Sequence, residues 1–329
     1  MSPTAAAVRP IARLEALFAA NRAAGRKALA PFVTAGDPDA ATTAEVIAAI
    51  AQAGGSLCEL GVPYSDPIAD GPVIQASYTR ALGKGLTLEG VFAIAKTAAA
   101  HTTMPILAMA SYSIIFRRGI DRFVADALAA GLAGFVVPDL PLEESDDLDA
   151  ACRTAGLALV RLVTPTTPPE RAAAIAKKST GFLYCVSVAG VTGARAELPA
   201  GLADRVRWLK TQTDVPILVG FGIASPEQVR AVAAVADGAI VGSALVKLVA
   251  ERATAPRADE QAVRAPARRS GRRASWRRGS RGRPCDPRPR GGRTGRSGRC
   301  PRGPRPSASR TARGVPPAGR RSSGSRRGS

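Results

Sequence analysis

The stretch Leu57-Cys-Glu-Leu-Gly-Val-Pro-Tyr-Ser-Asp-Pro-Ile-Ala-Asp-Gly-Pro72 runs from an apolar strand into a Pro/Gly-rich loop, and each part carries a carboxylate. Glu59 lies in the strand beside Leu57 and Leu60, so burial is expected to raise its pKa and let it hold a proton near neutral pH. Asp70 lies in the loop, where we expect it to stay ionised and to respond to positive charge. Two carboxylates held in different protonation states are the usual arrangement for acid-base chemistry in one site.

Predicted strands and helices alternate through residues 1–250. Short apolar runs are followed there by alanine-rich segments of helical periodicity. Strands are predicted at Leu29–Thr34, Leu57–Gly61, Ile106–Met109, Gly134–Val137, Ala158–Val163, Phe182–Val186, Ile217–Gly220 and Gly238–Val241. Helices are predicted at Ile11–Ala24, before the first strand, and then at Ala40–Ala53, Leu88–Ala100, Ile120–Ala130, Glu143–Ala155, Pro168–Lys178, Ala203–Thr213 and Pro226–Ala236.

This alternation predicts an α/β fold, a (β/α)8 TIM barrel with an extra N-terminal helix, because eight strand-helix units with parallel pairing close into a barrel. The alternative is an open doubly wound sheet, which would carry a Gly-rich dinucleotide loop after its first strand. That position reads Thr34-Ala-Gly-Asp-Pro-Asp39, a helix-entry turn. In a barrel the loops after the strands share one mouth, so Glu59, Asp70, Asp139 and Tyr184 are expected to face it.

Three Gly-rich stretches follow the sixth, seventh and eighth predicted strands, at Ala189–Ala194, Gly220–Pro226 and Gly242–Val246. Glycines let backbone N–H groups approach an anion closely, and the helix that opens after Gly242-Ser243 adds a favourable dipole. A plain tight turn would explain any one of them. Three at the corner where barrels commonly bind phosphate favour a phosphate site.

The net charge of +20 lies entirely in the last quarter of the chain. Residues 251–329 contain 24 Arg, no Lys and four acids, which leaves 22 basic and 22 acidic residues for 1–250. An inference of nucleic-acid binding from charge therefore applies only to the tail.

No apolar run reaches the ~18 residues of a membrane span, and no secretion signal is recognised, so a soluble cytoplasmic protein without a membrane partner is expected. The five cysteines show no CxxC pairing, and the chain has one histidine, His101. A histidine-based metal site or a Ser-His-Asp triad is nearly excluded on that ground, and no metal is expected. His101 follows an alanine-rich helix and is interpreted as a surface residue.

Residues 10–250 resemble the alpha subunit of tryptophan synthase. The matching motifs are Pro31-Phe-Val-Thr-Ala-Gly-Asp-Pro38, Glu59-Leu-Gly-Val-Pro-Tyr-Ser-Asp-Pro-Ile-Ala-Asp-Gly-Pro-Val-Ile-Gln75, Val137-Pro-Asp-Leu-Pro141, Gly190-Val-Thr-Gly193 and Gly220-Phe-Gly-Ile223. The resemblance implies a lyase of tryptophan biosynthesis that splits indole-3-glycerol phosphate into indole and glyceraldehyde 3-phosphate. It also implies no cofactor in this subunit, and a beta-chain partner that holds pyridoxal phosphate within an alpha2beta2 tetramer.

The resemblance further implies roles for individual residues. Glu59 would be the general acid and base, and Asp70 would stabilise the cationic indolenine. Tyr184 would lie near the glycerol chain, and Thr192 would belong to a loop that closes over the substrate and bonds the Asp70 loop. The phosphate would lie at Gly193, Gly222, Gly242 and Ser243, and the apolar slot for indole would be made by Phe32, Leu60 and Ile223.

The chain departs from the family pattern in two places. Ser111–Ile114 replaces a Tyr-Asn type sequence near the family's beta-subunit contact. The amphipathic last helix of the family is replaced, beyond a point between Glu251 and Arg264, by an Arg/Gly/Pro/Ser-rich tail. That composition predicts disorder, because it cannot bury enough surface to offset its chain entropy. The expected organisation is a catalytic barrel over 1–250 and a tail over 251–329, interpreted as a frameshift product of GC-rich codons.

Two rival functions stay open on the sequence. Another phosphate-binding barrel enzyme would share the phosphate corner, but it would normally place a lysine in the mouth, and no lysine occurs on these strand ends before Lys247. A nucleic-acid-binding role would rest on the tail, which has Trp276 as its only aromatic residue; no specific nucleic acid is expected.

Overall fold

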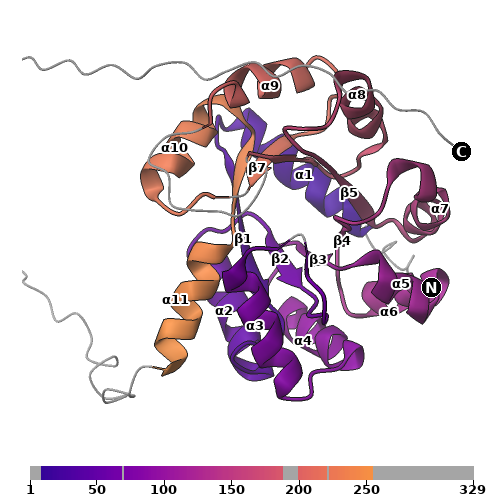
Figure 1. Cartoon of the computed structure of the whole chain (residues 1–329), viewed down its shortest axis with the longest axis vertical. Coiled ribbons are helices and arrows are strands. Elements are labelled where there is room, and N and C mark those ends of the chain that lie inside the picture. The colour runs from indigo at the N-terminus through magenta and orange to yellow at the C-terminus, as the bar shows by residue number, and fades with distance from the viewer. Residues whose placement is uncertain (1–8, 69, 188–198, 221, 255–329) are drawn as a thin grey trace, which may run out of the picture. The chain divides into compact units, whose positions relative to one another are not determined.

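Eight parallel strands close into a barrel in the order β1 to β8, with β8 paired to β1 (Figure 1). The structure is a computed structural model, and it describes residues 9–68, 70–187, 199–220 and 222–254. The predicted TIM barrel is confirmed, and the open doubly wound sheet is excluded because the sheet has no free edge. Each strand lies within one residue of its predicted bounds: β1 (Ala28–Thr34), β2 (Cys58–Gly61), β3 (Ile106–Met109), β4 (Gly134–Val136), β5 (Ala158–Val163), β6 (Leu183–Val186), β7 (Ile217–Gly220) and β8 (Gly238–Val241).

Helices cover the outside of this barrel, and all the predicted ones are present. Two differ from their predicted bounds by more than one residue: the first residues of the helix expected from Glu143 form a short 3-10 turn (Leu142–Glu144), and α9 ends at Leu209 instead of Thr213. His101 is the exposed last residue of α4, as expected. The helices are α1 (Pro10–Ala23), α2 (Ala40–Gln52), α3 (Pro72–Gly83), α4 (Leu88–His101), α5 (Tyr112–Arg118), α6 (Ile120–Ala129), α7 (Asp146–Ala155), α8 (Pro169–Lys178), α9 (Leu202–Leu209), α10 (Pro226–Val235) and α11 (Ser243–Thr254).

Two of these helices, α3 and α5, were not predicted from the sequence. The Gly71-Pro72 pair looks like part of the preceding loop, but Pro72 occupies the first position of α3, where its fixed φ favours a helix start. The N-terminus of α5 depends on a distant residue: Asp139 accepts hydrogen bonds from Ser111 Oγ (2.6 Å) and from Tyr112 N (2.8 Å). Asp139 therefore joins the loops after β3 and β4, and it does not line the cavity at the barrel mouth described below.

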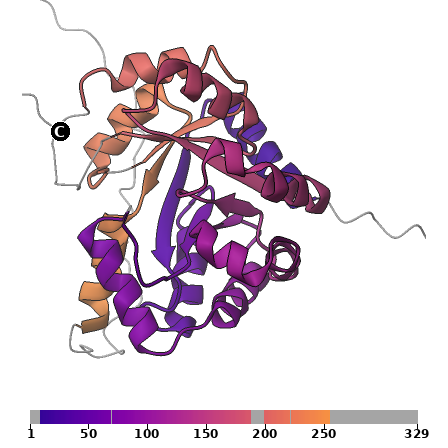
Figure 2. The same cartoon turned by 45° about the vertical axis from the view of Figure 1, so that its right-hand side comes forward.

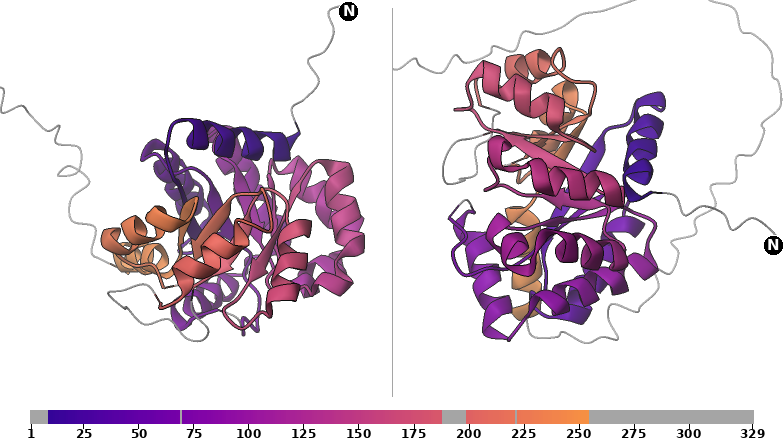
Figure 3. Two further views of the ribbon diagram at one scale, coloured as in Figure 1. Left: turned by 90° about the horizontal axis from the view of Figure 1, so that it is seen from above. Right: turned by 90° about the vertical axis from the view of Figure 1, so that its right-hand side faces the viewer.

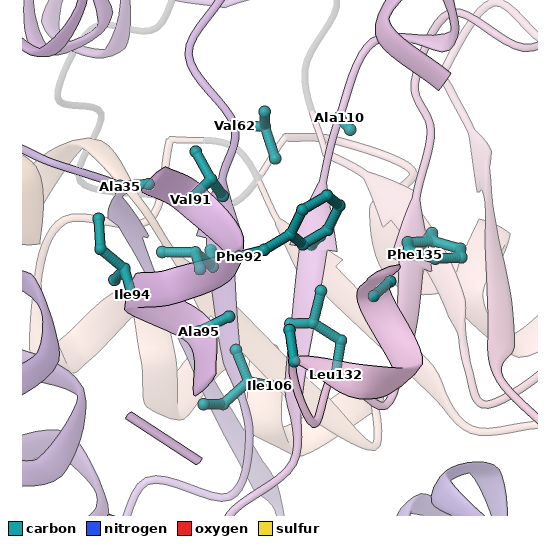
Figure 4. Packing of buried hydrophobic residues seen from close by; sticks show 14 of the residues in the cluster. Ala35, Val62, Val91, Phe92, Ile94, Ala95, Ile106, Ala110, Leu132 and Phe135 are labelled. Carbon is teal, nitrogen blue, oxygen red and sulfur yellow. The ribbon is translucent and has the colours of Figure 1, made fainter. Parts of the chain in front are cut away.

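The core has an inner layer and an outer layer because side chains on each strand alternate between the barrel interior and the helices. Phe32, Tyr184 and Leu107 belong to the inner cluster, whereas Val33 and Leu60 belong to the outer one. Figure 4 shows the outer layer, where Phe92 of α4 lies among strand residues. The Phe123 ring packs at centroid distances of 5.4 Å from Phe92 and 5.3 Å from Phe135.

The N-terminal helix α1 covers the end of the barrel where the strands begin (Figure 3). Phe18 packs on Phe182, immediately before β6, with ring centroids 6.1 Å apart. Ile11 N donates to the carbonyl of Gly156, and Arg13 Nη2 donates to that of Thr103; both carbonyls lie a few residues before a strand. The opposite end, where the strands finish, is left to the connecting loops.

The last described helix, α11, follows β8 and packs against α3 and β1 (Figure 2). It continues to Thr254, four residues past the domain boundary at 250 that composition suggests. The expectations of disorder and of a nucleic-acid role for the tail fall on residues outside the described part. None of the helices in the described ranges has both the length and the hydrophobicity needed to cross a bilayer.

Candidate active site

One cavity of about 340 Å³ opens at the mouth of the barrel, where the strands end. Its walls come from strands on both sides of the barrel, from the loop after β2 and from the start of α11. Eight of the eleven sequence-predicted site residues line it: Phe32, Glu59, Asp70, Tyr184, Gly222, Ile223, Gly242 and Ser243.

The other three predicted residues are not among the described residues that line the cavity. Thr192 and Gly193 lie outside the described residues. Leu60 is fully buried in the outer layer between the strands and the helices, so its expected place in the indole slot is wrong. The reason is the strand alternation: Glu59 faces the interior, and its neighbour must face outward.

Glu59 is a buried carboxyl with no ionic partner among the described residues. Its side chain is 1% exposed, and Oε1 has no hydrogen-bond partner in the same part of the chain. Burial raises its pKa to about 8, so the group carries a proton at neutral pH, as its apolar strand neighbours suggest. A neutral carboxyl facing an open cavity can donate a proton and afterwards accept one.

Asp70 lies at the end of the loop after β2, directly before Gly71, the N-cap of α3. Burial raises its pKa to about 6, which differs from the expectation of a carboxylate governed by positive charge. The group is still mostly ionised at pH 7 to 8. The two carboxyl groups thus differ in protonation at neutral pH, and burial is the cause of both shifts.

Tyr184 is a buried member of β6 whose hydroxyl stays neutral. Burial raises its pKa well above the usual value, and the carboxylates of Glu59 and Asp70 raise it further at the alkaline pH where both are ionised. Its ring occupies the space beside Gly220, where an added Cβ would lie 2.2 Å from the Tyr184 hydroxyl. Only glycine at position 220 leaves room for this ring, so Gly220 has a packing role here.

One corner of the cavity, called the glycine corner below, is lined by Gly222, Gly242, Ser243 and Ala244 and lies at the start of α11. Gly222 has φ +77°, a left-handed conformation that favours glycine. Ser243 and Ala244 open the helix, and the first amides of a helix have no acceptor within it, so they are available to an anion. An added Cβ at Gly242 would meet nothing closer than Phe32 Cβ at 3.7 Å, so the cavity is open at this point.

Sequence reasoning missed several lining residues. Met109, Ile74 and Ile240 complete the apolar wall, and strand alternation could have identified Met109, because it ends a strand on the inward-facing side. Lys247 lies one turn into α11 and is the one cation among the described lining residues. The sequence signal for this position is the i, i+4 spacing of Ser243 and Lys247, which puts both side chains on one face of the helix.

The closed barrel, the buried protonated carboxyl with an ionised neighbour, and the glycine corner define a class: a TIM-barrel enzyme that performs acid-base chemistry on an anionic substrate. A model of the family described as "Tryptophan synthase alpha chain" matches residues 18–273. The chain belongs to the tryptophan synthase alpha chain family. The resemblance inferred from the motifs is confirmed, and the chain is therefore a lyase of tryptophan biosynthesis acting on indole-3-glycerol phosphate.

Individual relatives agree with this assignment. The chain is 53% identical over 241 residues to the tryptophan synthase alpha chain of Rhodopirellula baltica, covering 72% of this chain and 87% of that one. It is 54% identical over 237 residues to the Synechocystis alpha chain, covering 72% and 90%. Among solved structures, Mycobacterium tuberculosis tryptophan synthase matches with a TM-score of 0.69 and 36% identity, covering 73% of this chain and 91% of that one.

Proposed function

We propose that indole-3-glycerol phosphate is cleaved in this cavity by Glu59 and Asp70, with the phosphate at the glycine corner. Glu59 donates its proton to indole C3, which gives an indolenine cation. The carboxylate formed then takes the proton of the glycerol hydroxyl on the carbon attached to C3. The bond between that carbon and C3 breaks, its electrons restore the neutral indole ring, and the aldehyde leaves as glyceraldehyde 3-phosphate.

Asp70 and Tyr184 contact different parts of the substrate, the indole ring and the glycerol chain. The Asp70 carboxylate accepts the indole N–H and stabilises the positive charge that appears on the ring. The Tyr184 hydroxyl hydrogen-bonds the glycerol chain without adding charge. The apolar wall of Phe32, Met109 and Ile223 accommodates the flat indole ring.

The observation that carries the proposal is the meeting of an uncharged Glu59 and an ionised Asp70 in one cavity with the glycine corner. Its test is release of indole from indole-3-glycerol phosphate by the purified chain. Loss of turnover in both Glu59→Gln and Asp70→Asn supports the mechanism. Native turnover in either variant contradicts it.

Lys247 is proposed to attract the phosphate. Its side chain is largely exposed, and Nζ lies 3.8 Å from Glu251 Oε1, so the expected contribution is that of a surface ion pair, about 0.5–1 kcal/mol. Lys247→Met should raise KM roughly 2- to 5-fold with kcat unchanged, and the effect should shrink as salt is added. The exposed Lys96→Met is the matched control. A native KM for Lys247→Met at low salt would rule out this role.

Family membership implies a beta-chain partner. We propose an alpha2beta2 tetramer with pyridoxal phosphate in the beta chain, no cofactor in this one, and a cytoplasmic location. The face that fits a partner is the rim formed by the loop after β2 and by α5, which surrounds a depression of about 690 Å³. Ile68 in that loop is 92% exposed and Phe116 of α5 is 69% exposed, an unusual exposure for large apolar side chains.

The tail is proposed to be a frameshift product that replaces the last helix of the family. The outward-facing Leu29 of β1 is 36% exposed, which is consistent with missing cover on this part of the barrel wall. Because α11 reaches Thr254, we place the change after that residue. We expect another reading frame of the gene to encode an amphipathic helix beyond this point. Sequencing the locus tests this, and a gene without such a frame would contradict the proposal.

A further inference from the structure

We propose that Gln75 is a positioning residue for Asp70, holding the backbone turn that carries the carboxylate. This inference rests on the proposed function, in which Asp70 stabilises the indolenine cation. Gln75 lies in the first turn of α3. Its side chain is exposed and does not line the cavity, so its effect is indirect.

The contacts join Gln75 to both ends of one turn. Gln75 Nε2 donates to the carbonyl of Asp70 at 2.9 Å and to the carbonyl of Pro67 at 3.2 Å. Asp70 N also donates to the Pro67 carbonyl, at 3.2 Å. Within the described part of the chain, Gln75 is the one side chain with a hydrogen bond to the backbone of Pro67, Ile68 or Asp70.

Asp70 depends on this backbone support because its carboxylate has no hydrogen-bond donor among the described residues. Among the described residues, the backbone turn is therefore the element that places the Cα and Cβ from which the carboxylate extends. Gln75 can fix the turn because its own backbone is held by helix bonds: Gln75 N donates to the Gly71 carbonyl at 3.0 Å, and Thr79 Oγ1 donates to the Gln75 carbonyl at 3.0 Å.

The chemistry of the two acceptors fixes the orientation of the amide. Both are carbonyl oxygens, so the side chain must present its NH2 group to them. A carboxylate at this position has no proton to donate and would face two carbonyl oxygens. Gln75→Glu keeps the shape of the side chain, removes both hydrogen bonds and adds repulsion, whereas Gln75→Met removes the hydrogen bonds alone.

The experiment compares both variants with Gln52→Glu, the same change at an exposed position on α2. Indole release gives kcat and KM, and the dissociation constant of glycerol 3-phosphate measures the phosphate end separately. A displacement of about 1 Å costs on the order of 100-fold in rate, so Gln75→Glu should lose roughly 10- to 100-fold in kcat. Glycerol 3-phosphate affinity should stay within about twofold, and Gln75→Met should lose less than Gln75→Glu.

The pH profile separates positioning from a purely structural effect. The carboxyl group introduced by Gln75→Glu can donate one hydrogen bond once it is protonated, so the ratio of Gln75→Glu to native activity should rise as pH falls. Gln75→Met and Gln52→Glu should show no such rise. Native kcat in both Gln75 variants, or equal losses of kcat and glycerol 3-phosphate affinity, would overturn the inference. If Glu59→Gln is inactive while both Gln75 variants are native-like, this inference alone fails; a fully active Glu59→Gln refutes the proposed function itself.

Discussion

Glu59→Gln should lower kcat/KM for indole release by about 10³-fold, because one carboxyl group performs both proton transfers and general acid-base catalysis contributes about 10²–10⁴-fold. The amide keeps the size of the side chain but can neither donate the required proton nor accept the one from the glycerol hydroxyl. The measurement is indole release from indole-3-glycerol phosphate by the purified chain.

Glu45→Gln is the matched control, an exposed carboxyl on α2 that should retain native activity. Affinity for glycerol 3-phosphate should be unchanged in Glu59→Gln, because the glycine corner does not include this side chain. A Glu59→Gln variant with native turnover would refute the proton transfer.

The pH dependence of the native chain follows from the same group. Glu59 must start protonated, and its pKa is raised to about 8, so kcat/KM should fall as pH rises above about 8. Asp70 must be ionised, and its pKa is raised to about 6, so kcat/KM should also fall as pH drops below about 6. The profile should therefore be a bell with its maximum near neutral pH.

Asp70→Asn should lower kcat/KM by roughly 10²–10³-fold, the usual cost of removing a group placed to stabilise transition-state charge. The amide oxygen can still accept the indole N–H, but it no longer carries the negative charge that offsets the cation. Indole release by the purified chain measures the loss, with glycerol 3-phosphate affinity as the check on the phosphate end.

Asp66→Asn is the matched control, because Asp66 lies in the same loop, is exposed, and is bonded by Ser65 Oγ at 2.6 Å. It should keep native turnover in the isolated chain. Equal losses of kcat/KM in Asp66→Asn and Asp70→Asn would show that activity depends on the summed negative charge of the loop. That result would contradict a specific role for Asp70.

Local sequence patterns were sufficient to predict the barrel. Each strand is a short apolar run between turn residues, and the parallel pairing of eight such units leaves few topologies. The missed elements depend on distant partners or on ambiguous residues: α5 starts where Asp139 bonds Ser111 and Tyr112, and α3 starts at a proline within a loop-like sequence. Pro72 and the N-cap Ser111 are local helix-start signals, but both stand in sequences that also read as loops, and the Asp139 contacts that hold the start of α5 are not visible in a window of neighbouring residues.

The site residues could be predicted from the sequence where a chemically suitable side chain also lies on the inward-facing side of its strand. Glu59 and Tyr184 lie on the inward side of their strands, whereas Leu60, the next residue after Glu59, lies on the outward side. The raised pKa of Asp70 depends on burial by residues brought together only in the fold. The sequence shows Lys247 only as a lysine after the last strand, and its place in the cavity depends on the position of α11.

The most direct test of the account is the protonation state of Glu59 in the free chain, measured by infrared difference spectroscopy between the native chain and Glu59→Gln across a pH series. The account predicts the carbonyl stretch of a protonated carboxyl group at neutral pH, absent from the variant and lost with a midpoint near pH 8. A Glu59 carboxylate already ionised at neutral pH, with a midpoint near the ordinary value of about 4.3, would contradict it.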